Sequence, residues 1–236
     1  PLGGLVVAHY GDLFGRKRAF AFSILLMSVA TLGIAFAPTY DAIGPAAPIV
    51  LVLLRIGQGA AIGGEVPGAW TLVTEHVPHR RLGLACGMVC SGFGFGILMA
   101  TLVTTAISVC VTPEQMLSFA WRIPFLIGGA LGILGYHLRR SLRESPVFKQ
   151  MTNCGTLVIE PPIAAVLRHH RRDVLLSMLL TWVLAAAVMM TALLTPIILR
   201  RLHGYDQGYI MGLASLGLTF HVIGCTLAGV ILDRIK

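Results

Sequence analysis

Long apolar segments alternate with short polar ones along the whole chain. Five stretches contain no Asp, Glu, Lys or Arg: residues 19–40, 82–113, 123–138, 174–199 and 207–232. A sixth stretch, residues 42–74, is interrupted only by Arg55 and Glu65. About 20 apolar helical residues cross the ~30 Å hydrocarbon core of a bilayer, and the third stretch reaches that length with residues 119–121 added. Residues 1–8 have the composition of the end of a further span, so the pattern predicts an all-α protein with about seven transmembrane helices.

The composition supports a membrane environment for most of the chain. Apolar residues make up 56% and charged residues 12%, and the mean hydropathy is +0.82. Ordinary globular chains carry about 25% charged residues. A soluble domain of this size leaves about a quarter or more of its surface exposed, so it cannot hide this much apolar area. We therefore exclude a soluble enzyme, a nucleic-acid-binding module and a secreted disulfide scaffold.

The net charge of +8 follows the predicted topology. Basic residues gather in alternate connections between spans: residues 16–18, 80–81, 139–172 and the chain end from Arg234. The opposite connections hold only Arg122, Arg200 and Arg201. Cytoplasmic loops of membrane proteins carry an excess of Lys and Arg, so the basic side is predicted to be cytoplasmic. The charge indicates orientation, and no nucleic-acid partner is expected.

A short motif near the start of the chain returns six spans later. Asp12 precedes Arg16 and Lys17 where an apolar segment ends, and Asp233 precedes Arg234 after the last span. Duplication of a six-helix unit produces a repeat of this kind.

Four further motifs follow one another along the chain. They are R-x-x-Q-G with G-G-E at residues 55–65, E-x-x-P with Arg and Gly at 75–83, W-R-I-P-F at 121–125 and E-S-P at 144–146. In this order, and together with the Asp12 loop, they resemble the major facilitator superfamily. The nearest resemblance is to its metabolite:proton symporter family, relatives of the sugar porters.

The resemblance implies a partial major facilitator fold, from the end of helix two to the end of helix eight. Residues 1–138 would belong to helices two to six of the N-terminal bundle, and residues 139–172 to the central cytoplasmic loop. Residues 173–236 would form helices seven and eight, at the start of the C-terminal bundle. Since the chain begins inside an apolar segment and without Met, we expect a fragment of a longer carrier.

A polar stripe crosses the second full span. Gln58 and Glu65 lie within about 80° of Arg55 around a helix, and the three side chains extend over about 15 Å. A charge at membrane depth is costly and usually faces a polar cavity or a partner. The stripe therefore predicts either a solute and proton-coupling path or a structural ion pair with another helix. His221 in the last span is either a proton shuttle or a packed neighbour.

Glycines are placed where helices could pack closely in the membrane. One group surrounds the polar stripe at residues 57, 59, 63 and 64, and a second occupies residues 87, 92, 94 and 96. Small residues allow close approach of helix backbones in lipid. The second group is predicted to form a helix-packing face, since it follows no strand and so does not resemble a nucleotide-binding loop.

The resemblance also implies a gate at the cytoplasmic rim. Its residues are Asp12, Arg16, Lys17, Glu75, Arg81 and Glu144, with Asp233 and Arg234 as the second copy of the loop motif. In this interpretation, Asp12 holds the two halves together in one conformation. The alternative is a set of solvated loop charges, each contributing under about 1 kcal/mol.

The family implied by these motifs transports solutes by alternating access. The prediction is a proton-coupled symporter of a small organic acid or zwitterion (a di- or tricarboxylate, a keto acid or a betaine), multi-pass in the bacterial inner membrane. Its partners would be the solute, protons and the lipid bilayer, and a monomer is consistent with the sequence. No cofactor is expected, and no enzyme, because the spans lack paired carboxylates, a nucleophile–base set and metal-ligand spacing. A drug or metabolite efflux antiporter and a non-transporting membrane fragment or sensor remain as alternatives.

Overall fold

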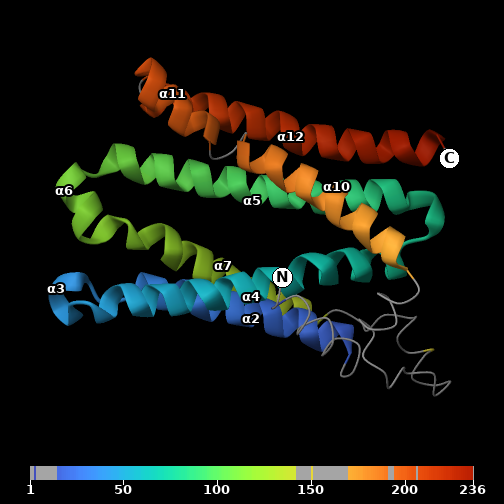
Figure 1. The fold of residues 1–236 in the computed structure, drawn as a ribbon, viewed down its shortest axis with the longest axis horizontal. Helices are drawn as coiled ribbons and strands as arrows, with labels where there is room; N and C mark the ends of the chain where they lie inside the picture. Colours follow the sequence, from blue (N-terminus) through green and yellow to red (C-terminus); the bar gives the residue numbers. More distant parts are fainter. Residues whose placement is uncertain are drawn as a thin grey trace.

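The computed structural model describes residue 3, residues 15–141, residue 150 and residues 170–190, 194–205 and 207–235. Within these ranges all regular structure is helical, as predicted (Figure 1). The elements are α2 (Arg16–Ala35), α3 (Tyr40–Ile43), α4 (Ala46–His76), η1 (His79–Arg81), α5 (Leu82–Cys110), α6 (Pro113–Gln115), η2 (Met116–Ala120), α7 (Arg122–Arg140), α10 (Arg171–Met189), α11 (Thr195–His203) and α12 (Gln207–Ile235). In the described part, five helices are long and apolar enough to cross a membrane, or six when one bent pair counts as a single span.

Glycine and proline set the helix boundaries near the predicted segment ends. Gly44 has a φ of 55°, a left-handed conformation that suits glycine, and Pro45 follows it. The segment predicted over residues 42–74 is therefore divided, and its long helix α4 starts at Ala46. Gly204 ends α11 in the same way, with a φ of 64°.

The span around residues 123–138 is bent. The segments Pro113–Ala120 and Arg122–Arg140 meet at 42°, and the five residues Met116–Ala120 form a π-helical turn. Thr112 opens this segment with a capping box, because its hydroxyl accepts the Gln115 N–H while the Gln115 side chain accepts the Thr112 N–H. Residues 119–121 thus extend the predicted span, but through a change of direction.

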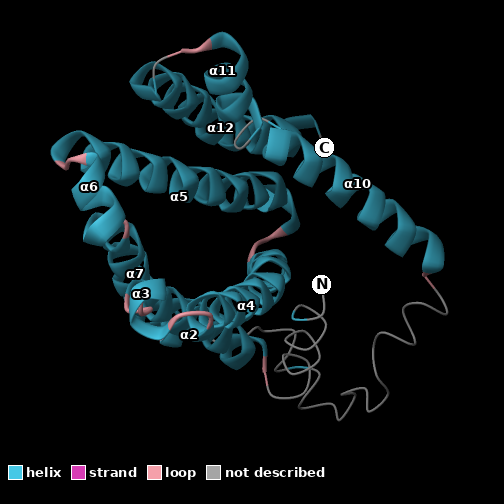
Figure 2. Ribbon diagram, turned by 60° about the vertical axis from the view of Figure 1, so that its left-hand side comes forward, coloured by secondary structure: helices cyan, strands magenta, loops and turns pink. Residues whose placement is uncertain are grey.

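The span predicted over residues 174–199 is described except for residues 191–193. Helix α10 ends at Met189, and a separate helix α11 starts at Thr195 with Pro196 in its first turn. Proline has no N–H and is best tolerated in the first turn of a helix. Helix α11 packs on α12 (Figure 2).

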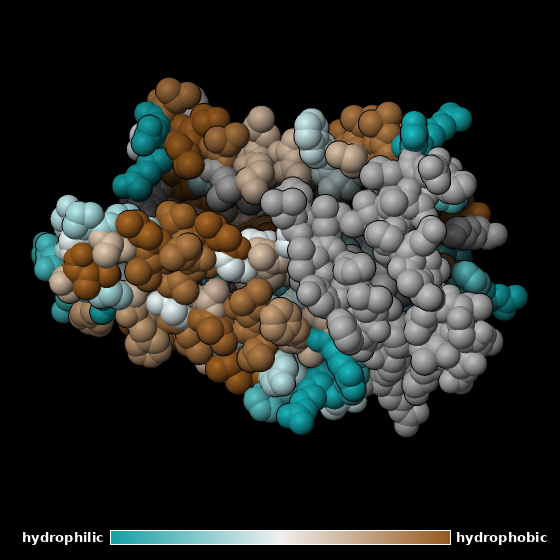
Figure 3. Space-filling view, turned by 60° about the horizontal axis from the view of Figure 1, so that its bottom comes forward, coloured by the Kyte–Doolittle hydropathy of each residue, from teal (hydrophilic) through white to brown (hydrophobic). Residues whose placement is uncertain are grey.

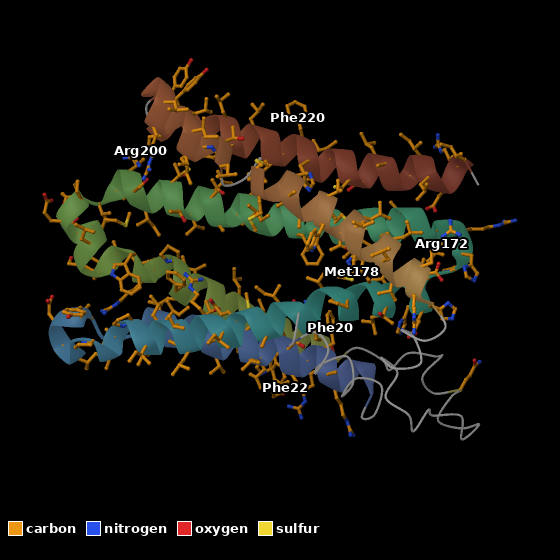
Figure 4. All side chains as sticks on the ribbon, in the orientation of Figure 1. Phe20, Phe22, Arg172, Met178, Arg200 and Phe220 are labelled. Carbon is orange, nitrogen blue, oxygen red and sulfur yellow. The ribbon has the colours of Figure 1, made fainter. Side chains whose placement is uncertain are left out.

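The long helices run back and forth with their basic ends on one side. In Figure 1 the starts of α2, α5 and α10 and the end of α12 lie toward the right, and the short elements α3 and α6 lie at the left. Figure 4 places Arg172 toward the right-hand end and Arg200 toward the left-hand end. This arrangement agrees with the alternating topology inferred from the charges.

Helix α2 forms the centre of the larger packing group, between α4 and α7. It contributes most of the buried apolar side chains, among them Phe20, Ile24 and Ile34. Its hydroxyl groups bond within the helix, since Ser23 donates to the Ala19 carbonyl at 3.0 Å and Ser28 to the Ile24 carbonyl at 2.6 Å. Large apolar side chains elsewhere are mostly exposed, and the described part of the face in Figure 3 is mainly hydrophobic. Such a surface fits contact with lipid.

Two faces of small residues bring helices close together. On α7, a Cβ atom added at Gly129, Gly132 or Gly135 would collide with side chains of α2. On α5, a Cβ atom at Gly87 would lie 2.6 Å from the Cys225 carbonyl oxygen of α12. At Gly92 and Gly96 it would meet nothing within 4 Å among the described residues, so only part of the predicted glycine face on α5 packs against a helix.

Candidate functional site

A hydrogen-bonded chain connects α4 to α2, two of the helices that are long and apolar enough to cross a membrane. The Arg55 Nη1 donates to Gln58 Oε1 at 3.1 Å, and Gln58 Nε2 donates to Thr31 Oγ1 at 2.8 Å. The Thr31 hydroxyl in turn donates to the Met27 carbonyl at 2.7 Å. Gln58 is buried, with 7% of its surface exposed, and these contacts hold its amide in one orientation.

The guanidinium group of Arg55 is held by neighbouring side chains, although the residue is exposed. Its Cζ atom lies 5.6 Å from the centre of the Phe125 ring on α7, within the range of a cation–π interaction. The residue itself is exposed. A guanidinium has five N–H donors in a planar fork that matches a carboxylate, and within the described residues Arg55 uses a donor for Gln58. The geometry therefore suits the binding of an anionic group.

An ion pair lies further along α4 toward the basic end. Arg139 Nη2 of α7 is 2.8 Å from Glu65 Oε1, and the two side chains are 24% and 19% exposed. The Arg139 Cζ atom lies 4.0 Å from the centre of the Phe20 ring on α2. One guanidinium thus connects all three helices of the larger packing group.

The predicted stripe is present in part. Arg55 and Gln58 are bonded directly, whereas Glu65 pairs with Arg139. The sequence pattern places Arg139 among the loop charges, but α7 continues to Arg140 and turns the Arg139 side chain inward. The signal that could have identified it is an arginine one residue beyond a charge-free stretch, in a protein with an intramembrane Glu that needs a partner. Thr31 carries no comparable signal.

His221 lies at a helix contact away from this stripe. A Cβ atom added at Gly94 of α5 would be 2.7 Å from His221 Cδ2, and His221 Nε2 is 3.6 Å from Cys225 Sγ on its own helix. In the described part of the chain no hydrogen bond or ion pair joins it to Arg55, Gln58 or Glu65. This placement favours a packing role, and its part in proton transfer stays a prediction.

At the basic end, Asp233 joins the last helix to the start of α5. Its Oδ1 accepts the Gly83 N–H at 2.7 Å and its Oδ2 accepts the Leu84 N–H at 2.8 Å. The first N–H groups of a helix have no partner within the helix, and the macrodipole there favours a negative charge. The carboxylate therefore holds the ends of α12 and α5 together.

The other residues of the predicted gate are described in part. Asp12 and Glu144 lie outside the described residues, as does the side chain of Arg16. Lys17 and Glu75 are half-buried, whereas Arg81 and Arg234 are exposed. The predicted latch by Asp12 therefore stays a prediction. Of the two aspartates in the repeated loop motif, the structure describes the contacts of Asp233.

Replacing Asp233 by Ala is expected to lower the free energy of unfolding by about 1–2 kcal/mol, the usual range for loss of a helix cap with charge-assisted bonds. Asp233→Asn, which keeps one acceptor oxygen, should cost about half as much. Thermal unfolding of the purified protein in detergent measures both. Arg234→Ala, at the exposed neighbouring position, should change stability by less than about 0.5 kcal/mol. Equal losses in Asp233→Ala and Arg234→Ala would contradict the capping role.

No group of three or more His, Cys, Asp or Glu side chains that could hold a metal ion occurs within the described residues. The candidate site consists instead of Arg55 with Gln58 and Thr31, and of the Glu65–Arg139 pair. The first set connects α4 to α2 and the second connects α4 to α7, so both charged groups lie within the packing group of α2, α4 and α7.

Comparison with known proteins agrees with the fold. The sequence model of the Major Facilitator Superfamily, which describes the family's shared residue pattern, matches residues 2–236. In a solved structure of the proton:xylose symporter XylE bound to 6-bromo-6-deoxy-D-glucose, the matched region covers 95% of this chain and 56% of that chain, with a TM-score of 0.68 and 17% sequence identity. At that identity the likeness shows the fold alone.

Curated relatives match a large part of the chain. The chain is 45% identical over 150 residues to the putative proline/betaine transporter of Staphylococcus aureus strain COL, covering 63% of this chain and 32% of the relative. It is 39% identical over 171 residues to the shikimate transporter of Escherichia coli strain K12, covering 72% and 39%. The inner membrane metabolite transport protein YhjE of the same strain is 37% identical over 177 residues, covering 75% and 40%. The chain thus spans about a third to two-fifths of the length of these relatives. The predicted multi-pass location in the cell membrane is confirmed.

Proposed function

Because this chain belongs to the major facilitator superfamily, we propose that it forms part of a proton-coupled symporter for a small organic acid or zwitterion. The observation that carries the proposal is the exposed Arg55, held at membrane depth by Gln58 and Phe125. Proline, betaine and shikimate, the solutes in the names of the relatives, all carry a carboxylate that a guanidinium can bind in bidentate fashion.

Glu65 is the proposed proton acceptor. In the described structure its negative charge is balanced by Arg139. Protonation would remove that charge and weaken the connection between α4 and α7, so it would favour a different packing of the two helices. A proton that binds one conformation better than the other shifts the balance between them. Coupling follows if the solute carboxylate at Arg55 favours the same conformation.

Uptake into proteoliposomes tests the function. The protein, expressed from its complete reading frame, is reconstituted and given an inward proton gradient with radiolabelled betaine, proline or shikimate outside. We expect gradient-driven uptake of at least one of these solutes, and its loss when a protonophore is added. Vesicles preloaded with solute test transport in the opposite direction. Proton-driven extrusion without uptake would favour the efflux antiporter. The proposal fails if neither direction responds to the gradient.

Replacement of Arg55 by Gln is expected to raise the KM for the carboxylate solute at least tenfold. A hydrogen bond between charged groups contributes about 1.5–3 kcal/mol, and glutamine keeps polarity but not the charge. Arg55→Lys should lose less, because it keeps the charge but not the planar fork. The matched control is Arg200→Gln, an exposed arginine at the opposite end of the membrane from the basic side. Unchanged KM in Arg55→Gln would exclude Arg55 from solute binding.

A further inference from the structure

A groove of about 470 Å³ lies between α2 and α7 at the basic end of the helices. Three of its lining residues are basic: Lys17 and Arg18 in the first turn of α2 and Arg140 in the last turn of α7. None of the described lining residues is acidic. The groove is therefore a concentrated positive site in the part of the chain that the structure describes.

The groove faces away from the candidate solute site. Arg139 turns inward to Glu65, whereas its neighbour Arg140 is exposed and lines the groove. Helix α2 likewise has an inner and an outer side. Phe20 is buried and contacts Arg139, whereas Phe22 is 58% exposed and lines the groove. Figure 4 shows Phe22 on the outer side of α2, away from α4. Among the described residues, the groove thus lies on the outer side of α2 and α7, where a bilayer would contact the protein.

The basic residues at the start of α2 are in an electrostatically unfavourable place. The N-terminal end of a helix carries a partial positive charge, which favours anions over cations. Arg16, Lys17 and Arg18 nevertheless occupy the first turn, which contains no acidic residue, and Gly15 offers no side-chain cap. A bound anion would interact favourably with the helix end and with the exposed Arg18, as phosphate groups do at other helix N-termini.

The rest of the groove is apolar and extends toward the membrane interior. Phe22 and Leu25 follow the basic residues along α2, and Tyr136 lies one turn before Arg140 on α7. From Lys17 to Leu25 the helix rises about 12 Å, which exceeds the 5–8 Å thickness of one headgroup layer. Tyrosine is enriched at the membrane–water interface, where the last turn of α7 is expected to lie. A soluble anion would use only the basic end, whereas a phospholipid would use both parts.

We propose that this groove binds one anionic phospholipid, such as phosphatidylglycerol, from the cytoplasmic leaflet. Its phosphate lies among Lys17, Arg18 and Arg140, and an acyl chain lies along Phe22 and Leu25. Basic pockets between transmembrane helices on the cytoplasmic side bind lipid headgroups in this way. The inference does not depend on the identity of the transported solute.

Native mass spectrometry of the full chain tests the site. The protein is titrated in detergent with phosphatidylglycerol or with phosphatidylcholine of the same acyl chains, and bound lipids are counted. The wild type is expected to retain one phosphatidylglycerol at concentrations where phosphatidylcholine is not retained. The double variant Arg18→Gln/Arg140→Gln should bind phosphatidylglycerol about 30-fold more weakly, the effect of removing two basic residues near an anionic lipid.

A matched variant and a soluble competitor make the result specific. Arg80→Gln/Arg172→Gln removes two exposed charges from the same side of the membrane and should bind lipid as the wild type does. Circular dichroism and thermal unfolding verify that both variants are folded. Equal loss in the two double variants, or equal retention of both lipids by the wild type, overturns the proposal. Displacement of phosphatidylglycerol by millimolar glycerol phosphate also overturns it, because the site would then take a soluble anion.

Discussion

Replacement of Gly87 by Leu is expected to destabilise the protein by about 3 kcal/mol, near the upper end of the usual range for overpacking. A Cβ atom at this position would lie 2.6 Å from the Cys225 carbonyl oxygen and 3.1 Å from Gly229 Cα. Both are backbone atoms of α12, so no side chain can rotate to make room. The two helices must separate, and the Asp233 cap on α5 would be pulled away with them. Unfolding monitored by circular dichroism during an SDS or thermal titration measures the loss.

The same helix provides the control. Gly92 lies on the opposite face of α5, and a Cβ atom there would meet no described atom within 4 Å. Gly92→Leu is therefore expected to leave the free energy of unfolding within about 0.5 kcal/mol, or to raise it slightly through better helix propensity. Similar destabilisation by the two substitutions would show that close packing of α5 on α12 is not what Gly87 provides.

Replacement of Arg139 by Met is expected to cost about 3 kcal/mol, the lower end of the range for breaking a buried ion pair. The lower end applies because Glu65 and Arg139 keep 19% and 24% of their side-chain surface exposed. The loss comes mainly from leaving the Glu65 carboxylate without its counter-charge. Arg139→Lys should lose less, because it keeps the charge while giving up the stacking on Phe20.

A second substitution separates the ion pair from simple packing. In the double variant Glu65→Gln/Arg139→Met no unpaired charge remains, so stability should return to within about 1 kcal/mol of the wild type. Uptake driven by the proton gradient should be abolished in this double variant if Glu65 accepts the proton. Arg172→Met serves as the exposed control. A double variant as unstable as Arg139→Met alone would mean that the arginine acts through its contact with Phe20.

Most transmembrane helices could be predicted because lipid leaves few choices. Backbone polar groups must be satisfied within the segment, so a charge-free stretch such as residues 82–113 forms a helix, and α5 occupies nearly all of it. The positions of prolines predict helix boundaries less well. Pro67 lies inside the continuous helix α4, whereas Pro196 lies in the first turn of a new helix. Their local sequences do not separate the two cases, because the outcome depends on neighbouring helices.

The candidate site shows the same division between local and distant contacts. Arg55 and Gln58 are three residues apart on one helix, and this spacing places their side chains together. The partner of Glu65 depends on how α7 packs along α4, which helical periodicity does not specify. For the glycines of α5, a helical wheel places Gly87 and Gly94 within about 20° of each other and Gly92 and Gly96 on the other side. The helical wheel does not show which of these two sides packs against α12.

The contact between α5 and α12 has a consequence for how the protein is made. Asp233 is separated from Gly83 by 150 residues, and domains are synthesised from the N-terminal end onward. Helix α5 therefore enters the membrane long before the helix that packs against its glycines exists. Until then lipid covers its close-packing face, and water solvates the N–H groups of Gly83 and Leu84. The arrival of α12 replaces both at once, which makes this late, long-range contact the step at which α12 joins the helices already in the membrane.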